Sequence, residues 1–194
     1  MRLFVAIEIP DNIRSIVQGF HPFHANWVDD VRNVRRENLH ITVKFFGEVT
    51  EAHLPALSET LNGVRCEGVP FKLQLSAVEC FPNRGPIATV ALGLAGDTDR
   101  LIRFHASLER ACEGLGFPSE RRPYVPHVTI ARARPPLPPY ARQVLQNTSL
   151  PRKADQEFFV DEFVLMQSHL KPGGPEYIRL ATFPLTKTDL EQSR

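Results

Sequence analysis

Two segments that lie far apart in the sequence each place a histidine two residues before a threonine, among β-branched residues. They are His40 with Thr42, in the run LHITV, and His127 with Thr129, in the run PHVTI. In a β-strand, alternate side chains point to the same face, so each run would present an imidazole and a hydroxyl on one side and an apolar surface on the other. One such pair can be accidental or structural. Two pairs, each in a run typical of a strand, indicate a duplicated functional element.

Paired imidazoles and hydroxyls suit acid–base chemistry at a phosphorus atom. When water opens a 2′,3′-cyclic phosphodiester, one group takes a proton from the water and another gives a proton to the leaving oxygen. Histidine can do either near neutral pH, because its ordinary pKa is about 6.5. The hydroxyls can donate hydrogen bonds to the non-bridging oxygens as charge builds there. The pattern predicts two strands facing each other across a cleft, and by itself it does not assign the acid and the base.

The order of the expected elements bears on the fold. Helical spacing and capping residues predict helices at 13–20, 51–61, 97–112 and 140–146. Apolar runs predict strands at 3–9, 39–46, 71–75, 87–94, 125–133, 158–167 and 177–183. We expect a loop at 21–38, a rigid break at 135–139 (PPLPP) and a turn at 171–174 (KPGG). Because strands and helices do not alternate regularly, the chain is predicted to be α+β with antiparallel sheets, not a doubly wound parallel sheet.

Length, composition and charge set broad limits. With 194 residues, 42% of them hydrophobic, the chain is long enough to bury a sizeable core, and we expect one domain of two packed lobes over 1–194. The net charge of +1 does not suit a protein that coats polyanions. Any contact with nucleic acid must therefore come from a small, salt-sensitive patch.

The cysteines and the apolar segments indicate the compartment. Cys66, Cys80 and Cys112 form no Cys-x-x-Cys pair, so neither a disulfide framework nor a zinc knuckle is expected. The apolar run in residues 1–8 is too short for a signal peptide, and no run approaches the length of a membrane span. We expect a soluble cytoplasmic protein with reduced thiols.

The two tetrads, HITV at 40–43 and HVTI at 127–130, resemble the paired signature of the 2H phosphoesterase family. The longer runs at 39–47 (LHITVKFFG) and 126–132 (PHVTIAR) resemble the bacterial and archaeal RNA 2′,3′-cyclic phosphodiesterases, also called 2′-5′ RNA ligases. Features that fit as well are residues 2–7 (RLFVAI), Ser168, Leu170, residues 172–174 and Tyr177. The resemblance thus covers nearly the whole chain, and the tetrads are its specific part.

The resemblance implies a bilobal, pseudo-symmetric α+β fold, with antiparallel sheets lining a central cleft and helices outside. It implies hydrolysis of RNA 2′,3′-cyclic ends to 2′-phosphates by a monomer that needs no metal or cofactor, on tRNA fragments or other short RNA. By resemblance, His40 is the proton donor, His127 is the proton acceptor, and Thr42 and Thr129 bind the phosphate. Some relatives also join RNA ends through 2′-5′ linkages.

Arg132 is a further candidate for binding the phosphate. Relatives carry an arginine at this place, and a guanidinium beside the phosphate would help to bind it. Strict alternation from His127 places Arg132 on the opposite face of the strand, unless a β-bulge intervenes. Both readings stay open at this point.

Four other residues are possible RNA contacts. Lys44 and Phe46 share the alternation of His40, so the lysine could face the cleft and the ring could stack on a base. A solvated lysine at the strand end and an aromatic residue in the core are the alternatives. Arg122 and Tyr124 precede the second tetrad and could line an RNA path, although adjacent arginines are usually only a solvated face.

Three other functions compete with an RNA-end phosphodiesterase. The first is a 2H enzyme that acts on a small cyclic nucleotide or a 2′-5′ oligonucleotide. The second is a non-catalytic module that binds nucleotides or RNA, which would have no use for an acid–base pair. The third is a structural protein with two coincidental motifs. Turnover of defined cyclic phosphates separates these possibilities.

Overall fold

The computed structural model describes residues 1–23, 27, 29–66, 70–148, 150, 156–172 and 174–186. Gly173, within the turn expected at 171–174, and part of the loop expected at 21–38 lie outside the described residues. Within the described part, no helix has both the length and the apolar character needed to span a bilayer.

Both His-x-Thr segments open strands of one antiparallel sheet, as the sequence predicts. The sheet has the order β7-β4-β5-β6-β3-β1-β8-β9, and β2 pairs with β6 outside this path. The strands are β1 (Arg2–Glu8), β2 (Val31–Asn33), β3 (His40–Glu48), β4 (Phe71–Phe81), β5 (Ile87–Gly96), β6 (His127–Leu137), β7 (Glu157–Val160), β8 (Glu162–Lys171) and β9 (Gly174–Pro184). Thus β3 carries the first tetrad and β6 carries the second, and the two are neighbours.

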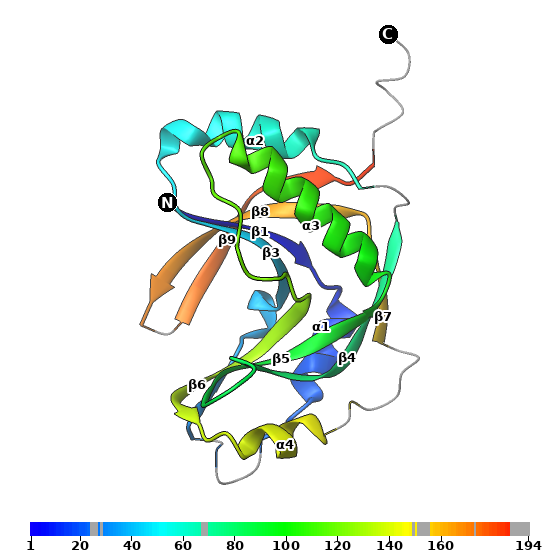
Figure 1. The fold of residues 1–194 in the computed structure, drawn as a ribbon, viewed down its shortest axis with the longest axis vertical. Coiled ribbons are helices and arrows are strands. Elements are labelled where there is room, and N and C mark those ends of the chain that lie inside the picture. The colour runs from blue at the N-terminus through cyan, green and yellow to red at the C-terminus, as the bar shows by residue number, and fades with distance from the viewer. Residues whose placement is uncertain are drawn as a thin grey trace.

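The helices lie outside this sheet (Figure 1). They are α1 (Asp11–Gly19), α2 (Leu54–Gly63), α3 (Thr98–Glu113) and α4 (Ala141–Gln146), with short 3-10 turns at Arg36–Asn38 and Glu51–His53. Helix α3 shows why they form where they do, because its buried residues Leu101, Phe104 and Leu108 recur at helical spacing. Helix α3 contacts β3, α2 contacts β9, and α4 contacts β4. The four predicted helices are confirmed.

The sheet divides into two halves where β3 meets β6. One half holds β9, β8, β1 and β3 with α2 and α3, and the other holds β6, β5, β4 and β7 with α4. The halves join through a single residue pair, Ile41 with Val128. Because the pairing is antiparallel, it sets His40 across from Thr129 and Thr42 across from His127. A local two-fold relation through this one pair therefore relates the tetrads, and the predicted bilobal α+β architecture is confirmed.

Most of the core lies between the sheet and the helices, but a smaller apolar cluster covers the tetrad side of the sheet. Its buried members are Phe4, Ala6, Val164 and Met166, and Tyr177 packs against it. These residues come from β1, β8 and β9, next to β3. They form an apolar floor beside the first histidine.

Three details of the predicted elements are wrong. The run 158–167 is two strands, since β7 pairs with β4 in one half and β8 with β1 in the other. Strand β2 falls in the expected loop, because its three residues are ordered only by pairing with β6. The prolines at 135 and 136 do not end β6. They lie between Arg132 and Leu137, which are consecutive paired residues of β6 in the pairing with β5. The two prolines therefore have no partner in β5, and their lack of an N–H group breaks no hydrogen bond between these strands.

Candidate active site

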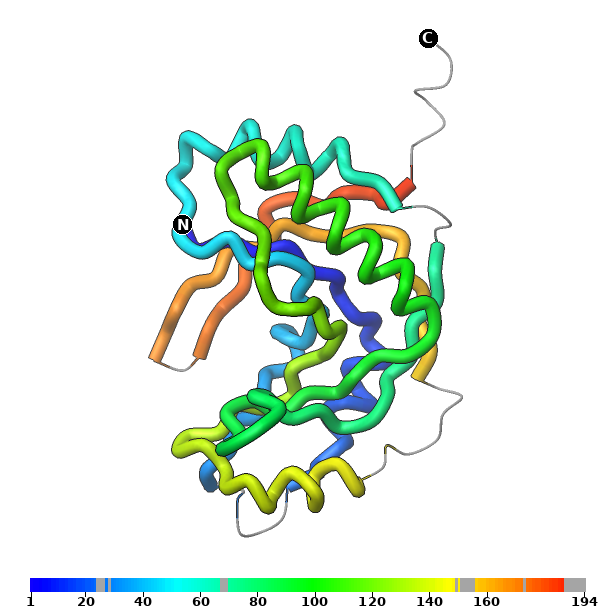
Figure 2. The backbone as a smooth tube through the Cα atoms, in the orientation of Figure 1, coloured from blue at the N-terminus to red at the C-terminus, as the bar shows by residue number. Residues whose placement is uncertain are grey.

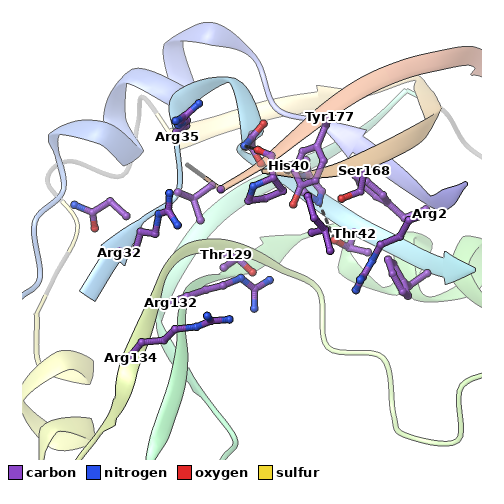
Figure 3. Close-up of a pocket in the computed structure, with 18 residues that line it drawn as sticks. Arg2, Arg32, Arg35, His40, Thr42, Thr129, Arg132, Arg134, Ser168 and Tyr177 are labelled. Carbon is purple, nitrogen blue, oxygen red and sulfur yellow. Dashed lines mark hydrogen bonds between the residues drawn. The ribbon is translucent and has the colours of Figure 1, made fainter. Parts of the chain in front are cut away.

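A cavity of about 490 Å³ opens on the tetrad side of the sheet (Figure 3). His40, Thr42 and Thr129 line it. His127 is not among the lining residues, but it stands two residues before Thr129, and its charge is close enough to His40 to lower the pKa of that ring. In a regular antiparallel pair, such diagonal neighbours lie roughly 7–8 Å apart. The four tetrad residues therefore gather at one site.

Both imidazoles are oriented in the same way by the backbone. His40 Nδ1 lies 2.7 Å from the carbonyl oxygen of Asn38, and His127 Nδ1 lies 2.7 Å from that of Val125. A carbonyl oxygen can only accept, so each Nδ1 carries a hydrogen and donates it. Each Nε2 is then left for chemistry at the site. His40 Nε2 lies 2.9 Å from the Thr42 hydroxyl oxygen, which completes a short contact within the first tetrad.

The charge state of His40 depends on its surroundings. Burial is the largest effect and lowers the pKa of His40 to about 4, and the charges of His127, Arg132 and Arg14 act in the same direction. The hydrogen bond to the Asn38 carbonyl acts in the opposite direction. With a pKa of about 4, His40 is neutral at pH 7. An anion bound beside it would raise its pKa, because an opposite charge favours the protonated ring.

Aromatic rings hold both histidines from the side. The His40 ring centroid lies 5.0 Å from that of Phe4 and 5.3 Å from that of Tyr177. The His127 ring centroid lies 4.8 Å from that of Phe81. Each imidazole therefore has a backbone carbonyl at Nδ1 and an aromatic wall, which together restrict its rotation.

A β-bulge follows the threonine in each tetrad strand. In β3, Thr42 and Lys44 pair with successive residues of β1, and Val43 has no partner. In β6, Thr129 and Ala131 pair with successive residues of β5, and Ile130 has no partner. Such a bulge reverses the alternation of the residues that follow it. The fifth residue after each histidine therefore returns to the cavity side of the sheet.

Arg132 is that fifth residue in β6, and it lines the cavity. Its Nη1 also donates to the Thr89 hydroxyl at 3.4 Å. The bulge at Ile130 is the reason that simple alternation would have placed Arg132 on the wrong face. Arg134, two residues further, lines the cavity as well.

The expectation that Lys44 and Phe46 share the face of His40 is wrong. Lys44 is 4% exposed and lies on the helix side, where its Nζ is 2.6 Å from Glu109 Oε2. The Phe46 ring packs against Phe117, with centroids 4.9 Å apart. The bulge at Val43 turned both away from the cavity. Phe45, which the sequence reasoning missed, lines the cavity instead and is 50% exposed.

The path expected along Arg122 and Tyr124 does not reach this cavity, because neither residue lines it. Arg122 is exposed and forms an ion pair with Glu120 at 3.5 Å. The Tyr124 hydroxyl donates to the Thr42 carbonyl oxygen at 2.9 Å and is thereby engaged inside the protein. The structure therefore does not place them at this cavity, and a contact of exposed Arg122 with RNA outside the cavity stays a prediction.

Of the residues that the structure describes, five arginines and no carboxylate line the cavity. They enter from both halves of the sheet (Figure 3) and are Arg2, Arg32, Arg35, Arg132 and Arg134. The near-neutral chain therefore concentrates positive charge in one place, as expected for a local anion patch. The basic run at 32–36 was the one signal in the sequence that could have indicated two of these residues. The chemistry that this site suits is binding of phosphate groups next to an acid–base pair.

Among the residues that the structure describes, no group of three or more His, Cys, Asp or Glu side chains is arranged to hold a metal ion. Cys80 and Cys112 are buried thiols within the part of the chain that the structure describes.

Comparison with known proteins agrees with the resemblance drawn from the tetrads. The model of the 2′-5′ RNA ligase superfamily matches residues 11–172. The chain is 35% identical over 183 residues to the RNA 2′,3′-cyclic phosphodiesterase of Archaeoglobus fulgidus, covering 94% of this chain and 99% of that protein.

Two solved structures have the same fold. The crystal structure of TT0787 of Thermus thermophilus superposes with a TM-score of 0.75 at 28% identity, over 95% of this chain and 98% of that one. The crystal structure of E. coli LigT complexed with 3′-AMP superposes with a TM-score of 0.74 at 26% identity, over 96% of this chain and 98% of that one.

Proposed function

This chain belongs to the 2′-5′ RNA ligase superfamily, and from that premise we propose that it hydrolyses RNA 2′,3′-cyclic phosphate ends to 2′-phosphates. One observation carries the proposal. Two imidazoles, each fixed at Nδ1 by a backbone carbonyl, stand on neighbouring strands, and one of them, His40, lines a cavity whose described lining holds five arginines and no carboxylate. Acid–base chemistry and phosphate binding are thereby combined at one site. The name of the Archaeoglobus fulgidus relative supports the same substrate.

The proposed reaction is one displacement at phosphorus. His127 Nε2 takes a proton from a water molecule, and the water oxygen attacks the phosphorus of the cyclic ester. The bond from phosphorus to the 3′ oxygen breaks, and that oxygen takes a proton from His40 Nε2. The product carries a 2′-phosphate and a 3′-hydroxyl. Thr42, Thr129 and Arg132 would bind the non-bridging oxygens, where charge increases.

His40 must be protonated to act as the acid, although burial in the protein lowers its pKa to about 4. The negative charge of the bound phosphate opposes the charges of Arg132 and His127 and raises that pKa again. Binding of the substrate therefore favours the protonated form of His40. We expect the pKa of the acid to be higher in the kcat profile than in the kcat/KM profile, because the first reports the bound enzyme.

The arginines favour RNA over a mononucleotide as the substrate. A cyclic mononucleotide has one phosphate, which Arg132 and the tetrads suffice to hold. Arg32 and Arg35, in the segment around β2, line the cavity as well, and they could bind further phosphates of an RNA strand, which a mononucleotide lacks. The same geometry would allow ligation, because an RNA 5′-hydroxyl in the place of water gives a 2′-5′ linkage.

The experiment is a product assay. Purified protein in EDTA is incubated with an oligoribonucleotide that ends in a 2′,3′-cyclic phosphate, and the end groups are identified. We expect a 2′-phosphate and a 3′-hydroxyl, and a 2′-5′ linkage when an RNA with a 5′-hydroxyl is added at high concentration. His40→Ala and His127→Ala should each lower the rate by about 10²–10⁴-fold. His53→Ala, at an exposed residue outside the cavity, is the control.

Two outcomes would contradict the proposal. Turnover of 2′,3′-cyclic mononucleotides without turnover of the oligoribonucleotide would favour a small-molecule phosphodiesterase. Binding of RNA with no change in its end groups would favour the non-catalytic module.

A further inference from the structure

The two tetrads are held together by very little direct strand pairing. Strands β3 and β6 pair only at Ile41 and Val128. In an ordinary antiparallel ladder, several successive pairs fix the register. Groups that act together on one phosphorus must be placed closely, since a displacement of about 1 Å can cost roughly 100-fold in rate. Another part of the molecule must therefore help to fix the relative position of the tetrads.

Residues 114–126, which we call the connecting segment, run from the end of α3 to the start of β6 (Figure 2). Lys44, two residues after the first threonine, reaches this segment through its Nζ, which donates to the Pro118 carbonyl oxygen at 3.1 Å. The same Nζ donates to Glu109 Oε2 at 2.6 Å, and the Glu120 amide donates to that oxygen at 3.3 Å. Glu109 of α3 thus joins β3 to the connecting segment.

Among the described contacts between β3 and the connecting segment, that of Tyr124 lies nearest to the tetrads. Its hydroxyl donates to the Thr42 carbonyl oxygen at 2.9 Å, and it stands three residues before His127. The Thr42 side chain in turn contacts His40 Nε2 at 2.9 Å. One hydrogen bond therefore links the backbone of the first tetrad to the approach of the second.

The Tyr124 ring is itself held in place. It stacks on His105 with centroids 4.1 Å apart and planes 4° from parallel, and His105 Nε2 lies 3.3 Å from Glu109 Oε1. Burial raises the pKa of Tyr124 well above its usual range, so its hydroxyl stays a neutral donor at any working pH. Neither Tyr124 nor His105 lines the cavity, so their contacts act through the protein and not on a bound phosphate.

We propose that Tyr124 is a positioning residue, which sets the spacing between the two tetrads by holding the Thr42 backbone to the connecting segment. The inference rests on the proposed hydrolysis, because its effect is measured through that reaction. Lys44 and Glu109 hold the same segment further along the chain, at Pro118 and Glu120. Lys44, which is buried beside the first tetrad, thus helps to position the tetrads without contacting RNA.

The test is Tyr124→Phe, which removes one oxygen and keeps the stacked ring. We expect kcat to fall roughly 10- to 100-fold, because the acid and base are misplaced, while KM changes little. The inhibition constant of inorganic phosphate should also stay the same, since the cavity lining is untouched. Tyr140→Phe makes the same chemical change at a residue that is 69% exposed, and should leave kcat as in the wild type.

A second variant tests the same positioning role if Tyr124→Phe lowers the stability of the protein. His105→Gln removes the stacked ring but leaves a side chain that can donate to Glu109, and it should lower kcat less than Tyr124→Phe at unchanged KM. Thermal unfolding of each variant shows whether the measured protein is folded.

Three outcomes would overturn the inference. In folded Tyr124→Phe, an unchanged kcat would remove the positioning role, and a raised KM at unchanged kcat would make Tyr124 a binding residue. If kcat loss only followed the unfolded fraction, the role would be structural. A wild-type protein that leaves the cyclic end intact would instead contradict the proposed function itself.

Discussion

The two halves of the molecule carry the same His-x-Thr frame and differ at the residues just after it. In each half, the histidine donates from Nδ1 to the carbonyl two residues before it. In each half, a bulge follows the threonine, at Val43 in one strand and at Ile130 in the other. The repeated frame suits groups that must approach one phosphorus atom from opposite sides.

The difference begins at the fourth residue after each histidine. In β3 it is Lys44, buried and paired with Glu109, whereas in β6 it is the small Ala131. The fifth residue is Phe45 in one half and Arg132 in the other, and both line the cavity. We infer that Arg132 binds the phosphate and that Phe45 contacts the base. The difference between these two positions would make the substrate bind in one orientation at an otherwise symmetric site. Variants at each position test this division.

The largest effect in this comparison is expected at Arg132. Arg132→Gln removes a charged donor from the phosphate, and kcat/KM for the cyclic oligoribonucleotide should fall roughly 10- to 100-fold. Arg132→Lys should recover only part of the loss, because a lysine lacks the planar pair of donors. Steady-state kinetics measure both. Arg122→Gln, outside the cavity, is the control, and an equal loss in that variant would mean that general charge matters and not position.

A smaller effect is expected at Phe45. Phe45→Leu keeps an apolar side chain but removes the ring, and KM should rise by about 5- to 10-fold with kcat nearly unchanged. This is the lower end of the roughly 1–3 kcal/mol that loss of stacking to alanine costs, because leucine keeps part of the apolar contact. The Arg2 guanidinium lies 4.9 Å from the ring centroid and would remain in place. Phe159→Leu changes a ring that is 67% exposed and outside the cavity, and serves as the control. A fall in kcat at constant KM would contradict a role in base binding.

The smallest effect concerns stability. The pKa of His40 is about 4 in the folded protein and about 6.5 when unfolded. Between these values the unfolded chain binds more protons, so the free energy of unfolding should fall as the pH drops from 6.5 to 4. His40→Asn removes that contribution and should flatten the decline in urea titrations across this range. Equal slopes for the variant and the wild type would show that the pKa of His40 is not depressed in the folded state.

The sequence could predict the tetrads, their strands and the bilobal fold, because His40 with Thr42 and His127 with Thr129 lie before the bulges, where alternation holds. It could not predict the faces of Lys44, Phe46 or Arg132, because a bulge depends on pairing with another strand. The separate strands within 158–167 escaped prediction for a similar reason, since β7 and β8 belong to different halves.

The sequence did not indicate the remaining cavity residues, and the reason is different. Arg2, on β1, and Arg134, near the prolines of β6, come from different halves of the sheet, and only the folded chain brings them to one cavity. Tyr124 was noticed for its position before the second tetrad, but its partner, the Thr42 carbonyl, is 82 residues away.

The central claim is that one imidazole gives a proton and the other takes one at the same phosphorus. The most direct measurement is the pH dependence of the residual kcat in the two single-histidine variants. With only His40 left, in His127→Ala, the rate should decrease as pH rises, because the acid loses its proton. With only His127 left, in His40→Ala, it should increase as pH rises. Profiles of the same shape in both variants would contradict the account.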